Sequence, residues 1–180
     1  DFPGLKREIN FDLEEEKIET VAFGQRQSSG FGRFGDREAE GIINVDVAPD
    51  LGKRAGDAVA VVIGNRNYRI RGVPSVDYAE RDARIFKSYL TRTLGLSESD
   101  VMYFTDASFT DFREIFGTED DHHGKLFSRV KKGTKVYVFY SGHGAPDVSE
   151  GSAYFVPSDS DPSKIKLTGY PVGLMKRNLA

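Results

Sequence analysis

A run of seven apolar residues, AVAVVIG at 58–64, constrains the fold of this chain more than any other feature. The run shows no alternation of polar and apolar residues, so it indicates a strand buried on both faces, as strands of parallel sheets are. A second run of the same character, KVYVFY, occupies 135–140. Shorter strand-like segments lie at 101–104 and 153–156.

Helical patterns separate these strand-like segments. Apolar residues recur at helical spacing from Ala79 to Leu94, and the pattern ends at Gly95, a residue suited to a helix C-cap. Strands that alternate with helices predict an α/β domain with a mostly parallel sheet and helices on both faces. Chemistry in such sheets gathers at the carboxyl ends of the strands. Further helices are predicted at 109–116, 124–130 and 169–180.

Residues 1–56 lack this alternation. Within them, GQRQSSGFGRFG (24–35) is rich in Gly, Ser and Arg and has no hydrophobic period, which is typical of a flexible linker or an exposed loop. We therefore divide the chain into an N-terminal extension at 1–56, a tether or a regulatory segment, and a folded domain at 57–180.

Composition excludes several classes of function. The net charge of −3 gives the chain no attraction to nucleic acid or to anionic lipid. No apolar run approaches the roughly 20 residues that a membrane helix needs. The chain contains no cysteine, so it has no disulfide and no thiolate metal site. We favour a cytoplasmic location.

The most informative motif follows the strand at 135–140. Ser141-Gly142-His143-Gly144 places a histidine on a loop at the carboxyl edge of the predicted sheet. Histidine titrates near neutral pH and can transfer protons, and flanking glycines allow unusual dihedral angles and a close approach of a ligand to the backbone. The alternative is a histidine in a tight turn, with the glycines present only for geometry.

Four segments occur in the order seen in caspase-like cysteine proteases, and they most resemble the bacterial caspase-like and metacaspase branch. The Ser-Gly-His-Gly motif after a hydrophobic strand is the most specific of the shared features, and the resemblance covers about residues 57–180. The segments are AVAVVIGNRNY (58–68), VPSVDYAERDARIF (73–86), KVYVFYSGHG (135–144) and AYFVPSDSD (153–161).

The resemblance implies cysteine endopeptidase chemistry. In the family, the histidine matching His143 activates a cysteine at the end of the next core strand and protonates the leaving amine. The amide of the glycine matching Gly144 helps to stabilise the tetrahedral oxyanion. The cysteine would lie outside this chain, in a remainder of the domain or on a separate chain. Ser141 is typical of a residue of the substrate pocket or the turn rather than of a nucleophile.

Asp82 is the second candidate. In metacaspases the matching aspartate lines the primary pocket and selects Arg or Lys before the scissile bond, whereas animal caspases carry an arginine where this chain has Ser75-Val76-Asp77. We expect the helix dipole to keep the Asp82 carboxylate ionised. The alternative is an acidic residue that only stabilises the first turn of its helix.

Other candidates are weaker. Asp121-His122-His123 resembles a metal pair, but neighbouring histidines point apart on a helix, so we interpret it as a solvated helix start. An acidic group after the histidine loop has oxygen ligands that suit calcium, which activates some metacaspases, although an exposed acidic loop is the simpler interpretation and we predict no cofactor. Its members are Asp147, Glu150, Asp159 and Asp161.

The sequence therefore predicts part of a cysteine endopeptidase that acts on protein or peptide substrates after Arg or Lys. One alternative is a non-catalytic caspase-fold module that binds partners or regulates a neighbouring domain. Another is an unrelated flavodoxin-like α/β binding domain in which His143 is structural.

Overall fold

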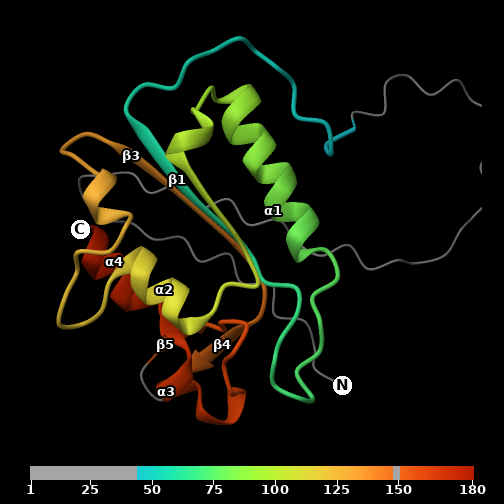
Figure 1. Cartoon of the computed structure of the whole chain (residues 1–180), viewed down its shortest axis with the longest axis vertical. Helices are drawn as coiled ribbons and strands as arrows, with labels where there is room; N and C mark the ends of the chain where they lie inside the picture. The colour runs from blue at the N-terminus through green and yellow to red at the C-terminus, as the bar shows by residue number, and fades with distance from the viewer. Residues whose placement is uncertain (1–43, 148–150) are drawn as a thin grey trace, which may run out of the picture. The chain divides into compact units, whose positions relative to one another are not determined.

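A computed structural model of the chain describes residues 44–147 and 151–180 (Figure 1). The Gly-rich stretch at 24–35, together with the rest of 1–43, lies outside the described residues. Most of the predicted extension therefore stays a prediction, and only its end at 44–56 lies within the described residues.

The central element is a parallel sheet of three strands in the order β2-β1-β3. The middle strand, β1 (Ala58–Gly64), is buried at all seven positions, as its uninterrupted apolar sequence predicts. It pairs in register with both neighbours, so that Gly64 lies opposite Thr105 at the end of β2 and opposite Ser141 at the end of β3. The flanking strands are β2 (Val101–Thr105) and β3 (Lys135–Ser141).

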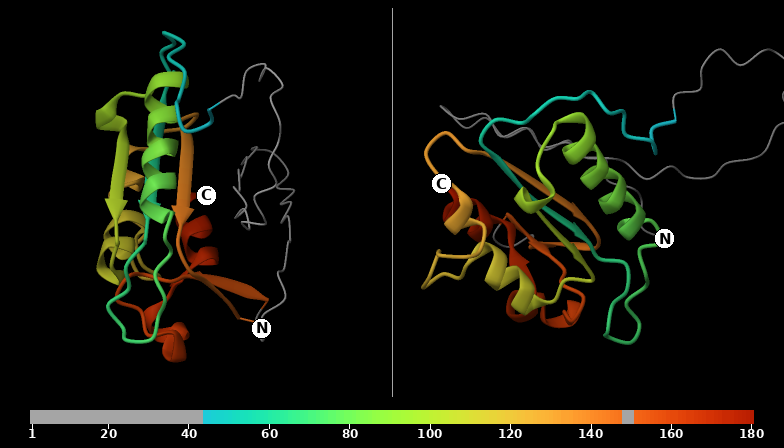
Figure 2. Two further views of the ribbon diagram at one scale, coloured as in Figure 1. Left: turned by 90° about the vertical axis from the view of Figure 1, so that its right-hand side faces the viewer. Right: turned by 45° about the horizontal axis from the view of Figure 1, so that its top comes forward.

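Helices cover both faces of this sheet (Figure 2). On one face lies α1 (Ala79–Ser88), which continues into a π-helical turn at Tyr89–Thr93. On the other face lie α2 (Phe109–Phe116) and α4 (Val172–Leu179). Alternate residues of β1 contribute to separate hydrophobic cores on the two faces of the sheet. Ala60 and Val62 pack in the core on the α1 side, whereas Val61 and Ile63 pack in the core on the side of α2 and α4. The predicted α/β class is confirmed, with a parallel sheet flanked by helices.

A second, antiparallel sheet in the order β4-β5-β6 follows β3. The sequence analysis predicted only the middle strand, β5 (Ser152–Phe155), and did not predict the antiparallel pairing. Its neighbours are β4 (Gly144–Asp147) and β6 (Tyr170–Pro171), and α3 (Ile165–Thr168) lies between β5 and β6. Half of the described strands are therefore antiparallel, so the prediction of a mostly parallel sheet holds for β1, β2 and β3 but not for the second sheet.

Residues 44–56 lie along α1 rather than apart from the domain. The Tyr89 hydroxyl donates to the Val45 carbonyl at 2.9 Å, and the Thr93 hydroxyl donates to the Pro49 carbonyl at 2.6 Å. Asp46 forms an ion pair with Arg81 on α1. The compact unit that contains the sheet therefore begins before residue 57. Residue 57 is where the sequence analysis placed the start of the folded domain.

The helix predicted at 124–130 is wrong. The segment forms only a 3₁₀ turn at Phe127–Arg129. The amides of Lys125 and Leu126 donate to the carbonyls of Glu114 and Ile115, so they complete the last turn of α2 instead of starting a helix of their own.

Further 3₁₀ turns are Glu98–Asp100 and Pro162–Lys164. Among the helices in the described ranges, none combines the length and apolar composition that crossing a bilayer requires.

Candidate functional site

The ends of β1, β2 and β5 are joined at the carboxyl edge of the parallel sheet by one buried side chain. Asn65, which follows β1, is 0% exposed. Its amide nitrogen donates to the carbonyls of Ala107 and Val156 at 3.1 and 3.3 Å, and its amide oxygen accepts from the Ala107 amide at 2.7 Å. The edge from which the Ser141–Gly144 loop emerges is therefore tied together by hydrogen bonds that leave little freedom.

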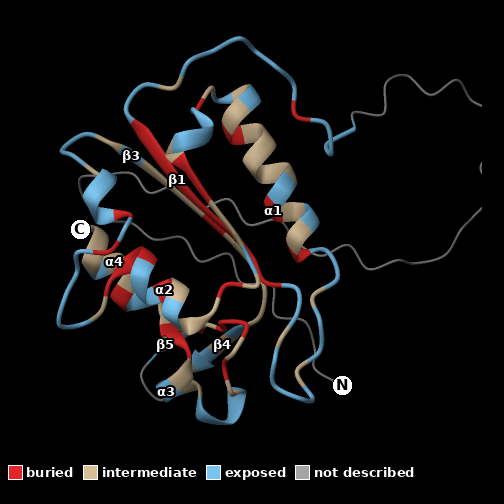
Figure 3. Ribbon diagram, in the orientation of Figure 1, coloured by how far each residue is buried: buried red, intermediate tan, exposed pale blue. Residues whose placement is uncertain are grey.

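The loop between β1 and α1 is mostly exposed (Figure 3). Its start is nevertheless anchored by hydrogen bonds to Asp106. Asp106, which follows β2, accepts hydrogen bonds from the amides of Arg66 and Asn67 and from the Asn67 side chain, at 2.8, 2.8 and 2.9 Å. Partial burial acts to raise the pKa of Asp106, but these hydrogen bonds outweigh it and hold the pKa below its ordinary value. An ionised carboxylate thus holds the start of the loop that carries Tyr68 and Pro74.

His143 contacts this loop through both its backbone and its ring. Its amide donates to the Tyr68 hydroxyl at 2.7 Å, and the two rings lie 4.8 Å apart between centroids. Its Nε2 lies 2.8 Å from the Pro74 carbonyl oxygen, which can only accept, so Nε2 carries a proton. In the neutral imidazole, Nδ1 is then the unprotonated nitrogen, available to accept a proton from another group.

The Gly144 amide points away from the hairpin. Gly144 pairs with Phe155 on β5, and the Val156 amide donates to the His143 carbonyl at 3.0 Å. This pattern makes Gly144 and Phe155 a non-hydrogen-bonded pair, in which the N–H groups face outward from the two strands. A Cβ atom at Gly144 would meet only the Tyr154 carbonyl oxygen, at an ordinary 3.7 Å. The amide of Gly144 can therefore donate to a ligand outside the hairpin.

Gly142 is required for a different reason from the one expected. Its φ is not in the left-handed region, so no unusual dihedral demands glycine there. A Cβ atom at Gly142 would lie 2.6 Å from the Tyr140 hydroxyl oxygen and 2.9 Å from that of Tyr68. The close neighbour is therefore a pair of tyrosines of the protein itself, not a ligand.

Asp82 lies on α1 above the same edge. The helix packs closely on the end of β1 through Ala79 and Ala83, because a Cβ atom at Gly64 would come within 2.6 Å of the Ala79 carbonyl oxygen. Gly64 in turn lies opposite Ser141, the last residue of β3. The Asp82 carboxylate is partly buried and makes no hydrogen bond or ion pair with the residues the structure describes. Partial burial raises its pKa, with the neighbouring Arg81 charge opposing the rise. This direction is opposite to the one expected from the helix dipole.

Ser141 ends β3 half-buried, and its carbonyl accepts from the Asn65 amide at 2.8 Å. The structure thus places Ser141 at the end of β3, His143 in the short connection that follows and Gly144 at the start of β4. Asp82 lies in the first turn of α1, the helix that packs over the end of β1. The sequence analysis missed Tyr68, Pro74 and Asn65. Tyr68 and Pro74 lie within segments on which the family resemblance rests, but no pattern marked them as partners of His143.

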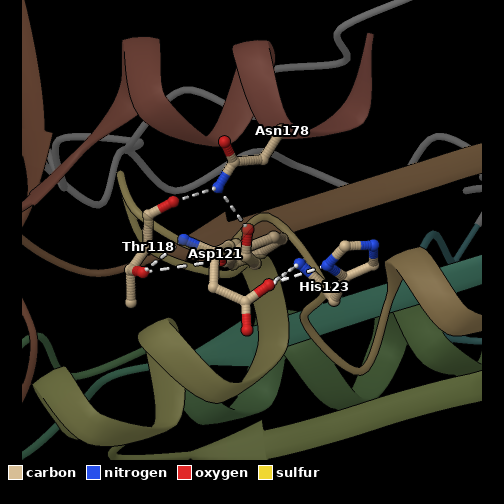
Figure 4. A network of polar contacts seen from close by, with 5 residues as sticks. Thr118, Asp121, His123 and Asn178 are labelled. Carbon is tan, nitrogen blue, oxygen red and sulfur yellow. Dashed lines mark hydrogen bonds and ion pairs between the residues drawn. The ribbon is translucent and has the colours of Figure 1, made fainter.

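The pair His122-His123 does not start a helix, and this part of the sequence analysis is wrong. The two rings do not point apart: their centroids are 4.0 Å from each other. Figure 4 shows Asp121 turned toward His123, where its Oδ1 lies 2.8 Å from the ring Nδ1. Asn178 on α4 donates to the Thr118 carbonyl in the same loop at 3.1 Å. Hydrogen bonds from His123 hold the pKa of Asp121 below its ordinary value.

Within 44–147 and 151–180, no group of three or more His, Asp or Glu side chains is arranged to hold a metal ion. Two members of the acidic group suggested for calcium serve as local caps. Asp159 accepts from the Phe109 amide at the start of α2 at 2.7 Å, and Asp161 accepts from the Ser163 amide at 3.0 Å. Glu150 and the side chain of Asp147 lie outside the described residues, so a calcium site at this loop stays a prediction.

Comparison with known proteins adds no family. No family model matches the chain, and no curated protein matches its sequence.

Proposed function

We propose that this chain forms the histidine-bearing part of a cysteine endopeptidase, with the thiol supplied from outside these 180 residues. The observation that carries the proposal is the state of His143: a neighbouring carbonyl holds its Nε2 proton, which leaves Nδ1 to act as a base. A base oriented by a third group is the arrangement that activates a nucleophile in acyl transfer. The resemblance to caspase-like proteases leads to the same chemistry.

The Gly144 amide supports the proposal. A tetrahedral intermediate carries negative charge on the former carbonyl oxygen, and a backbone N–H near that oxygen stabilises the transition state, typically by about 3 kcal/mol. Gly144 lies next to the proposed base, its N–H faces outward from the hairpin, and the space beside its Cα is open. A base and an oxyanion donor in adjacent residues suit peptide hydrolysis.

The edge of β3 offers a position for the strand that would carry the thiol. Within the described residues β3 pairs only with β1, and only Phe139 of its seven residues is buried, whereas every residue of β1 is buried. An uncovered strand edge with apolar side chains is a template for a further strand. A strand added parallel to β3 would end beside Ser141, at the edge where His143 lies.

We further propose that Asp82 selects Arg or Lys before the scissile bond. A partly buried carboxylate without an ionic partner favours a cationic side chain, and arginine can bind it through two hydrogen bonds. Because partial burial raises the pKa of Asp82, the carboxylate should lose its charge at a higher pH than an exposed aspartate does. The preference for arginine should weaken as the pH falls through that pKa.

The experiment uses fluorogenic peptides with Arg, Lys, Asp or Ala before the scissile bond. This chain alone should cleave none of them, whereas the protein that also contains the thiol-bearing strand should cleave after Arg and Lys. His143→Ala in that protein should lower kcat by about 100-fold or more, a typical loss for a general acid–base group. Turnover by this chain alone that is lost in His143→Ala would refute the need for an external thiol.

A second pair of variants tests the pocket. Asp82→Asn should lower kcat/KM for arginine peptides by about 100-fold, because the substrate guanidinium would lose its ionic partner. The matched control is Asp77→Asn, which removes an exposed carboxylate close to the start of the same helix. If the added strand lacks cysteine, the chain belongs to a non-catalytic module of the same fold instead. If the enzyme cuts after Asp, the pocket assignment is wrong.

A further inference from the structure

Tyr140 makes contacts that its ring alone does not explain. The ring packs into the core between Phe112 and Phe155, with centroids 6.0 and 4.8 Å away. A phenylalanine would fill the same space. The hydroxyl, however, lies 2.8 Å from the His143 carbonyl oxygen and 3.0 Å from the Val156 carbonyl oxygen, so its single proton is directed at two backbone acceptors.

The hydroxyl stays protonated, which makes it a permanent donor. Burial strongly raises the pKa of Tyr140, and the neighbouring Tyr68 raises it further. Tyr68 in turn holds the other side of the same residue, because its hydroxyl accepts from the His143 amide at 2.7 Å. The backbone of His143 is thus held at both its N–H and its C=O.

Holding the carbonyl of His143 also sets the direction of the next amide. The peptide group between His143 and Gly144 is planar and trans, so its C=O and N–H point in opposite directions. The carbonyl is directed toward Tyr140 and the Val156 amide. The N–H of Gly144 must therefore point away from both, toward the open side of the loop.

We propose that Tyr140 is a positioning residue whose hydroxyl orients the His143–Gly144 peptide and thereby aims the Gly144 amide at the carbonyl oxygen of a bound peptide. This inference rests on the proposed peptidase function for its ligand, but the orientation itself belongs to this chain. Without the hydroxyl, the His143 carbonyl keeps only the Val156 amide as a donor, and the peptide plane can rotate.

The first test needs no catalysis. Tyr140→Phe in this chain should leave unfolding cooperative, while ¹⁵N relaxation dispersion at the Gly144 amide shows exchange that is absent from the wild type. The matched control is Tyr137→Phe on the same strand, because Tyr137 packs against the opposite core and its hydroxyl has no hydrogen bond within the described residues. A Gly144 amide that behaves alike in both variants would overturn the proposal.

The second test measures turnover in the protein that contains the thiol-bearing strand. Tyr140→Phe should lower kcat about tenfold, with KM within twofold, because a misaligned oxyanion donor weakens transition-state binding more than substrate binding. Tyr137→Phe should leave both constants unchanged. An unchanged kcat in Tyr140→Phe would overturn the positioning role. If the wild type shows no turnover but the relaxation result holds, the proposed function fails and the orienting role of Tyr140 survives.

Discussion

Asn65→Asp tests the hydrogen bonds that tie the sheet edge beneath the candidate site. The substitution keeps the size of the side chain and the acceptor for the Ala107 amide. It replaces the nitrogen that donates to the carbonyls of Ala107 and Val156, at 3.1 and 3.3 Å, with an oxygen. In the ionised variant three oxygens would face one another at a position with no exposure to solvent.

The expected loss is large and depends on pH. Two donated hydrogen bonds contribute about 1 kcal/mol each, and an unsatisfied buried carboxylate adds about 2 kcal/mol or more, so the free energy of unfolding should fall by about 4 kcal/mol at pH 7. Burial and the two carbonyls raise the folded-state pKa of the new carboxyl above its unfolded value of about 3.9. The loss should therefore grow as pH rises above about 4 and shrink toward about 1 kcal/mol below it, where the carboxyl is neutral in both states.

Urea denaturation of both proteins between pH 4 and pH 7, followed by circular dichroism, measures this difference. Asn44→Asp is the control, because it adds the same charge at an exposed position where the side-chain oxygen already serves as an acceptor for the Asp46 amide. A loss for Asn65→Asp below about 1 kcal/mol at pH 7, or one independent of pH, would refute the reasoning.

Three further predictions concern the same edge. Gly142→Ala should lower the free energy of unfolding by about 1–3 kcal/mol in thermal denaturation, because the new methyl group would overlap two tyrosine hydroxyls. Gly144→Ala should leave the free energy of unfolding nearly unchanged, because the space beside Gly144 is open, and equal losses in the two variants would contradict this reasoning. The ionised Asp106 carboxylate should stabilise the fold at pH values above the unfolded pKa of an aspartate, and this stabilisation should be lost as the pH falls through the lowered folded pKa of Asp106. Asp106→Asn should remove this pH-dependent contribution, so parallel pH profiles of stability in the variant and the wild type would contradict the prediction. Ser108→Ala should cost about 1 kcal/mol in urea denaturation, since it breaks the capping box of α2.

The parallel sheet could be predicted because its strands carry their own signal. The uninterrupted run at 58–64 is short and rich in β-branched residues, which favours a strand buried on both faces over a buried helix. The strand β4 carries no such signal: its sequence is Gly-Ala-Pro-Asp, and its proline is tolerated because β4 lies at the edge of its sheet among the described strands. Periodicity also failed at 124–130, where distant backbone carbonyls determine the local conformation.

The candidate site divides in the same way. His143 could be singled out as a candidate because a histidine flanked by glycines follows a buried strand. Its partner at Nε2 could not, since the Pro74 carbonyl is a backbone group that any residue would supply, and only the folded loop brings it within 2.8 Å. The pKa direction of Asp82 was also beyond sequence reasoning, because partial burial, which depends on packing, is the main cause that raises this pKa.

The groups that would perform chemistry here are held by contacts within the described residues. The His143 backbone is fixed by Tyr68 and Tyr140, and its ring by Pro74. None of these contacts uses the backbone edge of β3 that has no partner among the described strands, where a further strand would pair. A base and an amide donor assembled in advance would need only the arrival of a nucleophile on a strand in the correct register. Under the proposed function, pairing at β3 would therefore control activity by bringing the thiol to a site already formed, rather than by reorganising that site.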